Sequence, residues 1–156
     1  MKKTKYTTFL VILFFSISLM AQDRMKRMDQ DKMKAYKIAY ITDQLDLSAK
    51  EAQKFWPIYN EISEKIEKLK RDTRIETMKQ IKELGGVENI SDNEAFVILK
   101  KDIAMKESVL VFEKQMMSKL QEFLPYKKIL KLHVAERDFK RKLFNELRKR
   151  RKKFKE

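Results

Sequence analysis

The feature that most constrains this chain is how little glycine and proline it contains: two of each in 156 residues. These residues supply most turns between short elements, so a chain this poor in them has few places to reverse. The glycines are adjacent, at Gly85 and Gly86, and the prolines are Pro57 and Pro125. Charged residues make up 38% of the chain, and no segment sustains an alternation of apolar and polar residues. We therefore predict an all-α chain of four helices.

Residues 1–21 have the pattern of a secretory signal peptide. Three lysines among the first five residues precede an apolar run over 9–20, and the small residue Ala21 marks the expected cleavage point. A transmembrane anchor is the alternative, but a helix that spans a bilayer needs about 20 apolar residues, and this run is shorter. We therefore expect export, to a bacterial periplasm, with cleavage near Ala21.

Residues 22–147 are expected to form one helical domain, followed by a basic tail over 148–156. The short segment from Gly85 to Ile90 should reverse the chain, so that the second and third helices form a long antiparallel αα-hairpin. Few glycines and many charges suit a thin layer of helices that dimerisation completes. The four expected helices run from Asp29 to Leu45, from Ala49 to Leu84, from the Ser91 cap to Phe123, and from Pro125 onward.

Apolar spacing predicts which face of each helix is buried. In the second helix the expected stripe runs from Phe55 to Leu84, and in the fourth from Ile129 to Leu147. In the first helix the expected inward residues are Ala35, Ile38, Ile41 or Thr42, and Leu45. In the third helix they are Phe96, Leu99, Ile103, Leu110, Met117, Leu120 and Leu124.

The second helix opens with a start signal and continues into an aromatic cluster. Ser48 can cap the next backbone amides, and Glu51 can reach back to the amide of Ser48, which makes a capping box. Phe55 and Trp56 precede Pro57, which removes one helix hydrogen bond and favours a bend. We interpret these residues as structural, forming an aromatic anchor where neighbouring helices cross.

Two runs within this region resemble a known family. The run Leu47-Ser48-Ala49-Lys50-Glu51 resembles the Leu-Thr-x-x-Gln (LTxxQ) motif of the Spy/CpxP family of periplasmic stress proteins. The run Phe55-Trp56-Pro57-Ile58-Tyr59 is similar to a bacterial branch of that family. Members of this branch are identified as periplasmic heavy-metal sensors or as sensors of extracytoplasmic-function (ECF) sigma factors. The family opens a later helix with a second motif copy, whose place is taken here by the divergent run Leu124-Pro125-Tyr126-Lys127-Lys128.

The resemblance, which covers about residues 33–148, implies a dimeric, curved helical cradle that holds partly folded proteins on a basic and apolar surface. It implies a chaperone-like role in the periplasmic stress response. The motif residues expected to be structural are Leu47, Ser48, Glu51, Phe55, Trp56, Pro57, Tyr59, Leu124 and Pro125. The residues expected to contact clients or partners are Met105, Met116, Met117, Arg137, Lys140 and Arg141.

Positive charge is concentrated near the C-terminus. Residues 126–156 contain 14 Lys or Arg and 4 Asp or Glu, whereas residues 22–125 are nearly neutral. Nucleic acid is one conceivable partner, but the absence of a recognition helix, a zinc site or an aromatic stacking platform argues against it in an exported chain. Anionic lipid head groups or acidic segments of proteins fit better. A solvated tail that only maintains solubility is the remaining alternative.

The side-chain inventory leaves little for catalysis or metal binding. His133 is the single histidine and cysteine is absent, which excludes a Cys/His dyad and leaves too few ligands for a tetrahedral zinc site. Met25, Met28 and Met33 are spaced to meet on one helix and would suit Cu(I), although such methionines more often form adaptable contact surface. We predict a non-enzymatic protein without a cofactor or a bound metal.

Two functions remain open at this point. The first is chaperone-like binding of unfolded or stress-related periplasmic proteins. The second is a dedicated signalling role, in which the chain modulates a membrane sensor or an anti-sigma factor by helix docking. Suppression of client aggregation would support the first function, and a single stoichiometric partner would support the second.

Overall fold

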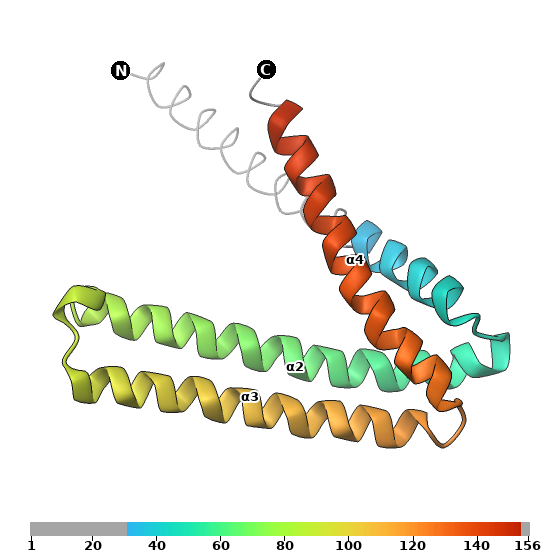
Figure 1. The fold of residues 1–156 in the computed structure, drawn as a ribbon, viewed down its shortest axis with the longest axis horizontal. Helices are drawn as coiled ribbons and strands as arrows, with labels where there is room; N and C mark the ends of the chain where they lie inside the picture. The colour runs from blue at the N-terminus through green and yellow to red at the C-terminus, as the bar shows by residue number, and fades with distance from the viewer. Residues whose placement is uncertain (1–30, 154–156) are drawn as a thin grey trace, which may run out of the picture. The chain divides into compact units, whose positions relative to one another are not determined.

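The computed structural model describes residues 31–153, and all the regular structure in this range is helical (Figure 1). The helices are a segment over 31–45, α2 (Ala49–Glu83), the 3₁₀ helix η1 (Val87–Asn89), α3 (Asp92–Leu120) and α4 (Tyr126–Lys153). The described range contains four α-helices and no strand, so the prediction of an all-α chain with four helices is confirmed. The expected signal peptide over 1–21, as well as Met25 and Met28, lies outside the described residues.

The described residues divide into two compact units. The α2–α3 unit comprises Asp46–His133, and the terminal unit comprises residues 31–45 and 134–153. Helix α4 contributes its first turns to the α2–α3 unit and the remainder to the terminal unit. Because α4 continues unbroken to Lys153, most of the region expected to be a tail is helical.

Helices α2 and α3 lie side by side within the α2–α3 unit and run in opposite directions (Figure 1). Two ion pairs join them in inverted order: Lys119 Nζ lies 4.0 Å from Glu61 Oε2, and Lys101 Nζ lies 2.5 Å from Glu76 Oε1. Solvent-exposed pairs of this kind contribute little stability. Apolar packing therefore supplies most of the attraction between the two helices.

The turn between α2 and α3 depends on the two glycines. Gly85 and Gly86 have backbone φ angles of +82° and +98°, which residues other than glycine rarely adopt. The Gly86 N–H donates to the carbonyl of Ile81 at 2.9 Å, and the Asn89 side-chain amide donates to the carbonyl of Gly85 at 2.7 Å. The first bond satisfies a carbonyl that the end of α2 leaves without a helical partner, and the second closes the turn that follows.

The buried faces of α2 and α4 follow the apolar spacing of the sequence. In α2, Phe55, Tyr59 and Ile62 are buried, and the later members of the expected stripe are half-buried. In α4 the buried members are Ile129, Leu132, Ala135 and Phe139. The predicted stripes of these two helices are confirmed, apart from Leu147, whose side chain is not described.

The predicted buried face of α3 is wrong for most of its length. Phe96, Leu99, Ile103 and Leu110 are all at least half exposed. The face turned inward carries Val109, which was not predicted, and half-buried neighbours one or two turns away. Only the last two members of the predicted stripe, Leu120 and Leu124, are buried as expected. Helix α3 has apolar residues on two faces, so hydrophobic spacing alone cannot select the face that packs against α2.

The terminal unit has a small aromatic core. The Tyr36 and Tyr40 rings lie 5.6 and 5.8 Å, between centroids, from the ring of Phe139. Lys142 Nζ lies 4.4 Å from the centroid of the Tyr40 ring, within cation–π range. In the segment over 31–45, Ile41 and Leu45 are buried as expected, whereas Ile38 is 41% exposed and Ala35 is exposed.

Candidate functional site

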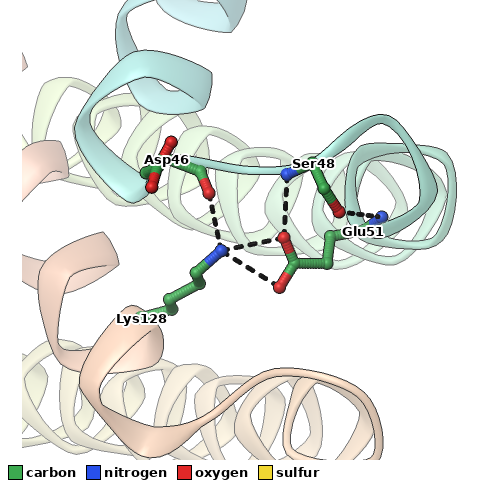
Figure 2. Close-up of polar contacts among 4 residues, drawn as sticks. All are labelled: Asp46, Ser48, Glu51 and Lys128. Carbon is green, nitrogen blue, oxygen red and sulfur yellow. Dashed lines mark hydrogen bonds and ion pairs between the residues drawn. The ribbon is translucent and has the colours of Figure 1, made fainter.

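The start of α2 has the capping box that the sequence predicts. The Ser48 N–H donates to Glu51 Oε2 at 2.8 Å, and the Glu51 N–H donates to Ser48 Oγ at 3.3 Å (Figure 2). Each residue thereby satisfies an amide that the helix terminus leaves without a backbone partner. The reciprocal bonds also fix the position of the Glu51 carboxylate.

Lys128, in the first turn of α4, binds this carboxylate (Figure 2). Its ammonium lies 3.0 and 2.8 Å from the two carboxylate oxygens of Glu51, and it donates to the backbone carbonyl of Asp46 at 2.6 Å. About four-fifths of each charged side chain is covered, since Lys128 is 21% and Glu51 is 23% exposed. We call this cluster of Asp46, Ser48, Glu51 and Lys128 the junction; it ties the start of α4 to the start of α2 within the α2–α3 unit.

The junction strongly favours the ionised form of Glu51. Hydrogen bonding from Lys128, followed by the backbone amide of Ser48, lowers the pKa of Glu51 from 4.5 to about 2. Asp46 adds a backbone constraint, because its φ angle of +49° lies in the left-handed region. That conformation places the Asp46 carbonyl where Lys128 can reach it.

The junction joins the two runs that resemble the family motif. Glu51 is the fifth residue of the run 47–51, and Lys128 is the fifth residue of the run 124–128. The leucine that opens the second run, Leu124, is buried, whereas the leucine of the first run is half-buried. The second run is the divergent one, and Lys128 is not among the residues that the sequence predicts for a site. The charge reversal at matching positions, glutamate in one run and lysine in the other, was the signal that could have found it.

The aromatic residues of the run 55–59 pack against one another in the α2–α3 unit. Phe55 is completely buried and stacks on Tyr59 with ring centroids 5.2 Å apart. Trp56 meets both rings edge-on and is half-buried. Pro57 and Pro125 are exposed, and α2 continues through Pro57 without interruption.

The three methionines expected to contact clients do not share one face. Met105 and Met116 are half-buried and lie at helical spacing with the buried Val109, on the inner face of α3. Met117 is 43% exposed on a different face of α3. There it joins a line of exposed apolar residues that we call the α3 outer face: Phe96, Leu99, Ile103, Leu110 and Met117.

The three basic residues expected to contact partners do share one face, on the terminal-unit part of α4. Arg137, Lys140 and Arg141 are all exposed, and Arg141 also pairs with Asp138 at 3.0 Å. Helical spacing places them with further exposed side chains on what we call the α4 basic face. Its members are Val134, Arg137, Lys140, Arg141, Phe144 and Arg148.

The described residues contain no group of three His, Cys, Asp or Glu side chains arranged to hold a metal ion. Among the helices of residues 31–153, none has both the length and the apolar character needed to cross a membrane. Comparison with known proteins found no matching family model, no matching curated protein and no matching solved structure.

Proposed function

We propose that this chain is an exported, non-enzymatic stress protein that binds partly unfolded proteins in the periplasm, in a chaperone-like manner. One observation supports this proposal above the others: the α4 basic face combines exposed cations with large exposed apolar side chains. Phe144 is 67% and Val134 is 43% exposed, and Arg137 and Arg141 lie between them on the same face.

This combination suits loose binding of varied sequences. Long-range attraction by cations speeds the encounter with acidic segments. Exposed Phe and Val, together with the alkyl stems of Arg and Lys, then offer apolar contact without a shape that selects one ligand. Acidic, partly unfolded segments are therefore the class of client that this face fits best.

The arrangement we propose around this face follows the family resemblance. The α2–α3 pair would act as a long αα-hairpin in a thin, curved layer, and two copies would associate to form a cradle of the Spy/CpxP type. Support comes from the lysine–glutamate junction between the two motif-like runs, and from the signal-peptide pattern over residues 1–21. We expect the protein to need no cofactor.

The test is aggregation of a model client, followed by light scattering at physiological salt, with the chain lacking residues 1–21. We expect near-equimolar protein to suppress scattering. The triple variant Arg137→Glu, Lys140→Glu and Arg141→Glu should lose most of that suppression, because its face no longer attracts acidic segments. The matched control reverses three exposed α2 cations instead, at Lys68, Lys70 and Arg74, with an identical change in net charge.

Equal loss in both triple variants would assign the effect to net charge and remove the α4 basic face from the proposal. A folded parent protein that suppresses nothing would contradict the chaperone-like function altogether. In that case a pull-down that recovers one stoichiometric partner would support the alternative, a dedicated signalling protein that modulates a membrane sensor or an anti-sigma factor.

A further inference from the structure

The α3 outer face is a line of apolar side chains that stay exposed in the α2–α3 unit. Phe96 and Leu99 are each 62% exposed, Ile103 is 56%, Leu110 is 50% and Met117 is 43% exposed. Single exposed apolar residues are ordinary, but several on one side of a helix, here at spacings of three, four and seven residues, mark an interaction surface. The inner face of α3 already packs against α2, so the outer face is a second apolar surface on the same helix.

Four exposed charges flank the central part of this line. Glu107 and Lys114 border it on one side, and Lys106 and Glu113 border it on the other. Lys106 pairs with Asp102 at 2.7 Å, while no ion pair among the described residues involves the other three. The flanks carry equal numbers of lysine and glutamate, which gives no net attraction to an anionic lipid surface or to a strongly basic partner.

We propose that the α3 outer face, over its part from Ile103 to Met117, binds the same part of a second copy of this chain, with the two α3 helices antiparallel and Leu110 at the twofold axis. This inference deepens the dimeric state named in the proposed function and rests on that part of it. It does not depend on client binding, which we assign to α4.

The charge pattern is self-complementary in this arrangement. In an antiparallel pair related by a twofold axis, residues on one flank of a helix meet residues on the same flank of the other helix. With Leu110 facing Leu110, the Glu107 carboxylate meets Lys114 of the second copy, and Lys106 meets Glu113 of the second copy. In the apolar line itself, Ile103 then faces Met117 of the second copy.

Moving the twofold axis by half a heptad, which slides one helix along the other by a full heptad, is excluded by the same charges. It would place Ile103 against Leu110 of the second copy, which suits the apolar line. However, it would also bring Glu107 against its own symmetry mate and Lys100 against Lys114, and like charges at such positions are repulsive.

A slide that places Ile103 on the axis is less favourable than the Leu110 register. It pairs Lys100 with Glu107, but it leaves Lys106 beside Leu99 and leaves Glu113 without a lysine. The Leu110 register uses all four flanking charges, so we assign the dimer to it.

The extent of the face indicates a reversible dimer. The overlap of the two helices in this register is roughly 20 residues, or about 30 Å. A single helix pair of that length buries less than the roughly 800 Å² per partner of a standard stable interface. We therefore expect a monomer–dimer equilibrium that depends on protein concentration.

The first experiment is sedimentation equilibrium of the parent chain and two variants, over a range of concentrations. Leu110→Glu places two like charges at the axis, and we expect it to raise the dimer dissociation constant by about tenfold or more. Ile75→Glu is the matched control, because Ile75 is 59% exposed on α2 and should leave the equilibrium unchanged. A monomeric parent, or an unchanged dimer in folded Leu110→Glu, would overturn the proposal.

Charge reversal tests the pairing without changing the apolar line. Glu107→Lys and Lys114→Glu should each weaken the dimer, since each creates a like-charge pair on both sides of the axis. The double variant restores opposite charges and should return the dissociation constant to near the parent value. If both single variants weaken the dimer and the double variant does not restore the dissociation constant, the Glu107–Lys114 assignment is overturned.

Cysteine cross-linking tests the register directly, because the natural chain has no cysteine. Under mild oxidation, Leu110→Cys should form a disulfide-linked dimer. Ile103→Cys and Met117→Cys should each stay uncross-linked alone, and the double variant carrying both should cross-link. Self-cross-linking of Ile103→Cys would overturn the Leu110 register.

The two proposals can fail separately. The α4 triple variant should remain dimeric even where client suppression is lost, because the α3 outer face is intact. A dimer that forms as expected without client suppression would leave this inference standing and contradict the proposed function. A monomer that still suppresses client aggregation would do the reverse.

Discussion

Lys128 connects parts of the chain that the sequence separates by 77 residues. Its ammonium group binds both carboxylate oxygens of Glu51 and the carbonyl of Asp46. All three contacts are therefore lost if the Lys128 side chain is removed. Because the pair is mostly covered, it is less screened than the other ion pairs of the described helices. Among the ion pairs of the described helices, the junction is therefore the one where a single substitution should have the clearest effect on stability.

The junction should make stability depend on acidic pH. The pKa of Glu51 is lowered from 4.5 to about 2, so its contribution is fully present above about pH 4.5 and is lost as the pH falls towards 2. We expect Glu51→Gln to be less stable than the parent at neutral pH and to lose less stability on acidification. Urea unfolding at a series of pH values measures both effects.

Glu94→Gln is the matched control for that measurement. Hydrogen bonds from the side chain and the backbone amide of Ser91 also lower the pKa of Glu94, but no lysine binds this carboxylate among the described residues. The pH dependence should therefore change less in Glu94→Gln than in Glu51→Gln. Identical pH profiles for the parent and Glu51→Gln would contradict the assignment.

Asp46 should tolerate glycine but not a β-branched residue. Its φ angle of +49° costs a side chain of ordinary shape about 1 kcal/mol or more. We expect Asp46→Val to lower the free energy of unfolding by about 1–2 kcal/mol, whereas Asp46→Gly should be close to neutral. Only the backbone carbonyl of Asp46 meets Lys128, so Asp46→Asn serves as a control that retains this bond. Equal stability of the valine and glycine variants would contradict the prediction.

At the scale of elements, α2 and α3 differ in how many apolar faces they present. Helix α2 buries one stripe from Phe55 onward and exposes a mostly charged surface. Helix α3 packs one apolar face against α2 and exposes another. An exposed apolar face on a helix that already packs through another face is typical of an interaction surface, which is why α3 and not α2 points to an interface.

Two phenylalanines distinguish these faces. Phe55 is 0% and Phe96 is 62% exposed. We expect Phe55→Ala to cost about 3–5 kcal/mol, because it leaves a cavity beside Tyr59. Phe96→Ala should change the monomer by no more than about 0.5 kcal/mol. Urea unfolding at low protein concentration, followed by far-UV circular dichroism, makes the comparison. Similar costs for both would show that Phe96 is buried in the monomer.

At the scale of the whole molecule, the two proposed interactions belong to different units. Client binding is assigned to the α4 basic face in the terminal unit, and self-association to the α3 outer face in the α2–α3 unit. Each can therefore be removed by surface substitutions that leave the other unit unchanged. The net charge of the chain, +14, favours solubility and opposes association between copies. Self-association must overcome that repulsion and should strengthen with added salt.

Dimerisation should make thermal stability depend on protein concentration. Binding between folded copies stabilises the native state by mass action. Above the dimer dissociation constant, we expect the thermal midpoint of the parent to rise by about 2 °C or more for each tenfold rise in concentration. The midpoint of Leu110→Glu should stay constant over the same range, as measured by differential scanning calorimetry. A constant midpoint for the parent at all concentrations would contradict self-association.

Local information determined much of this protein. The scarcity of glycine and proline predicted long helices, the Ser48 and Ser91 capping boxes predicted where α2 and α3 begin, and both boxes form. The turn at Gly85 and Gly86 was likewise readable, because positive φ angles there require glycine. These features depend on residues close together in the chain, so their physics is contained in short stretches of sequence.

Only the tertiary structure decided which face of α3 is buried and what binds Glu51. Both faces of α3 are apolar, so the choice depends on which one α2 covers. The Glu51–Lys128 pair depends on the packing of α4 against the start of α2. The charge reversal between the two runs is visible in the sequence, but it does not show that the runs lie together. Periodicity reports how apolar a helix face is, but it carries no information about the partner, and burial depends on that partner.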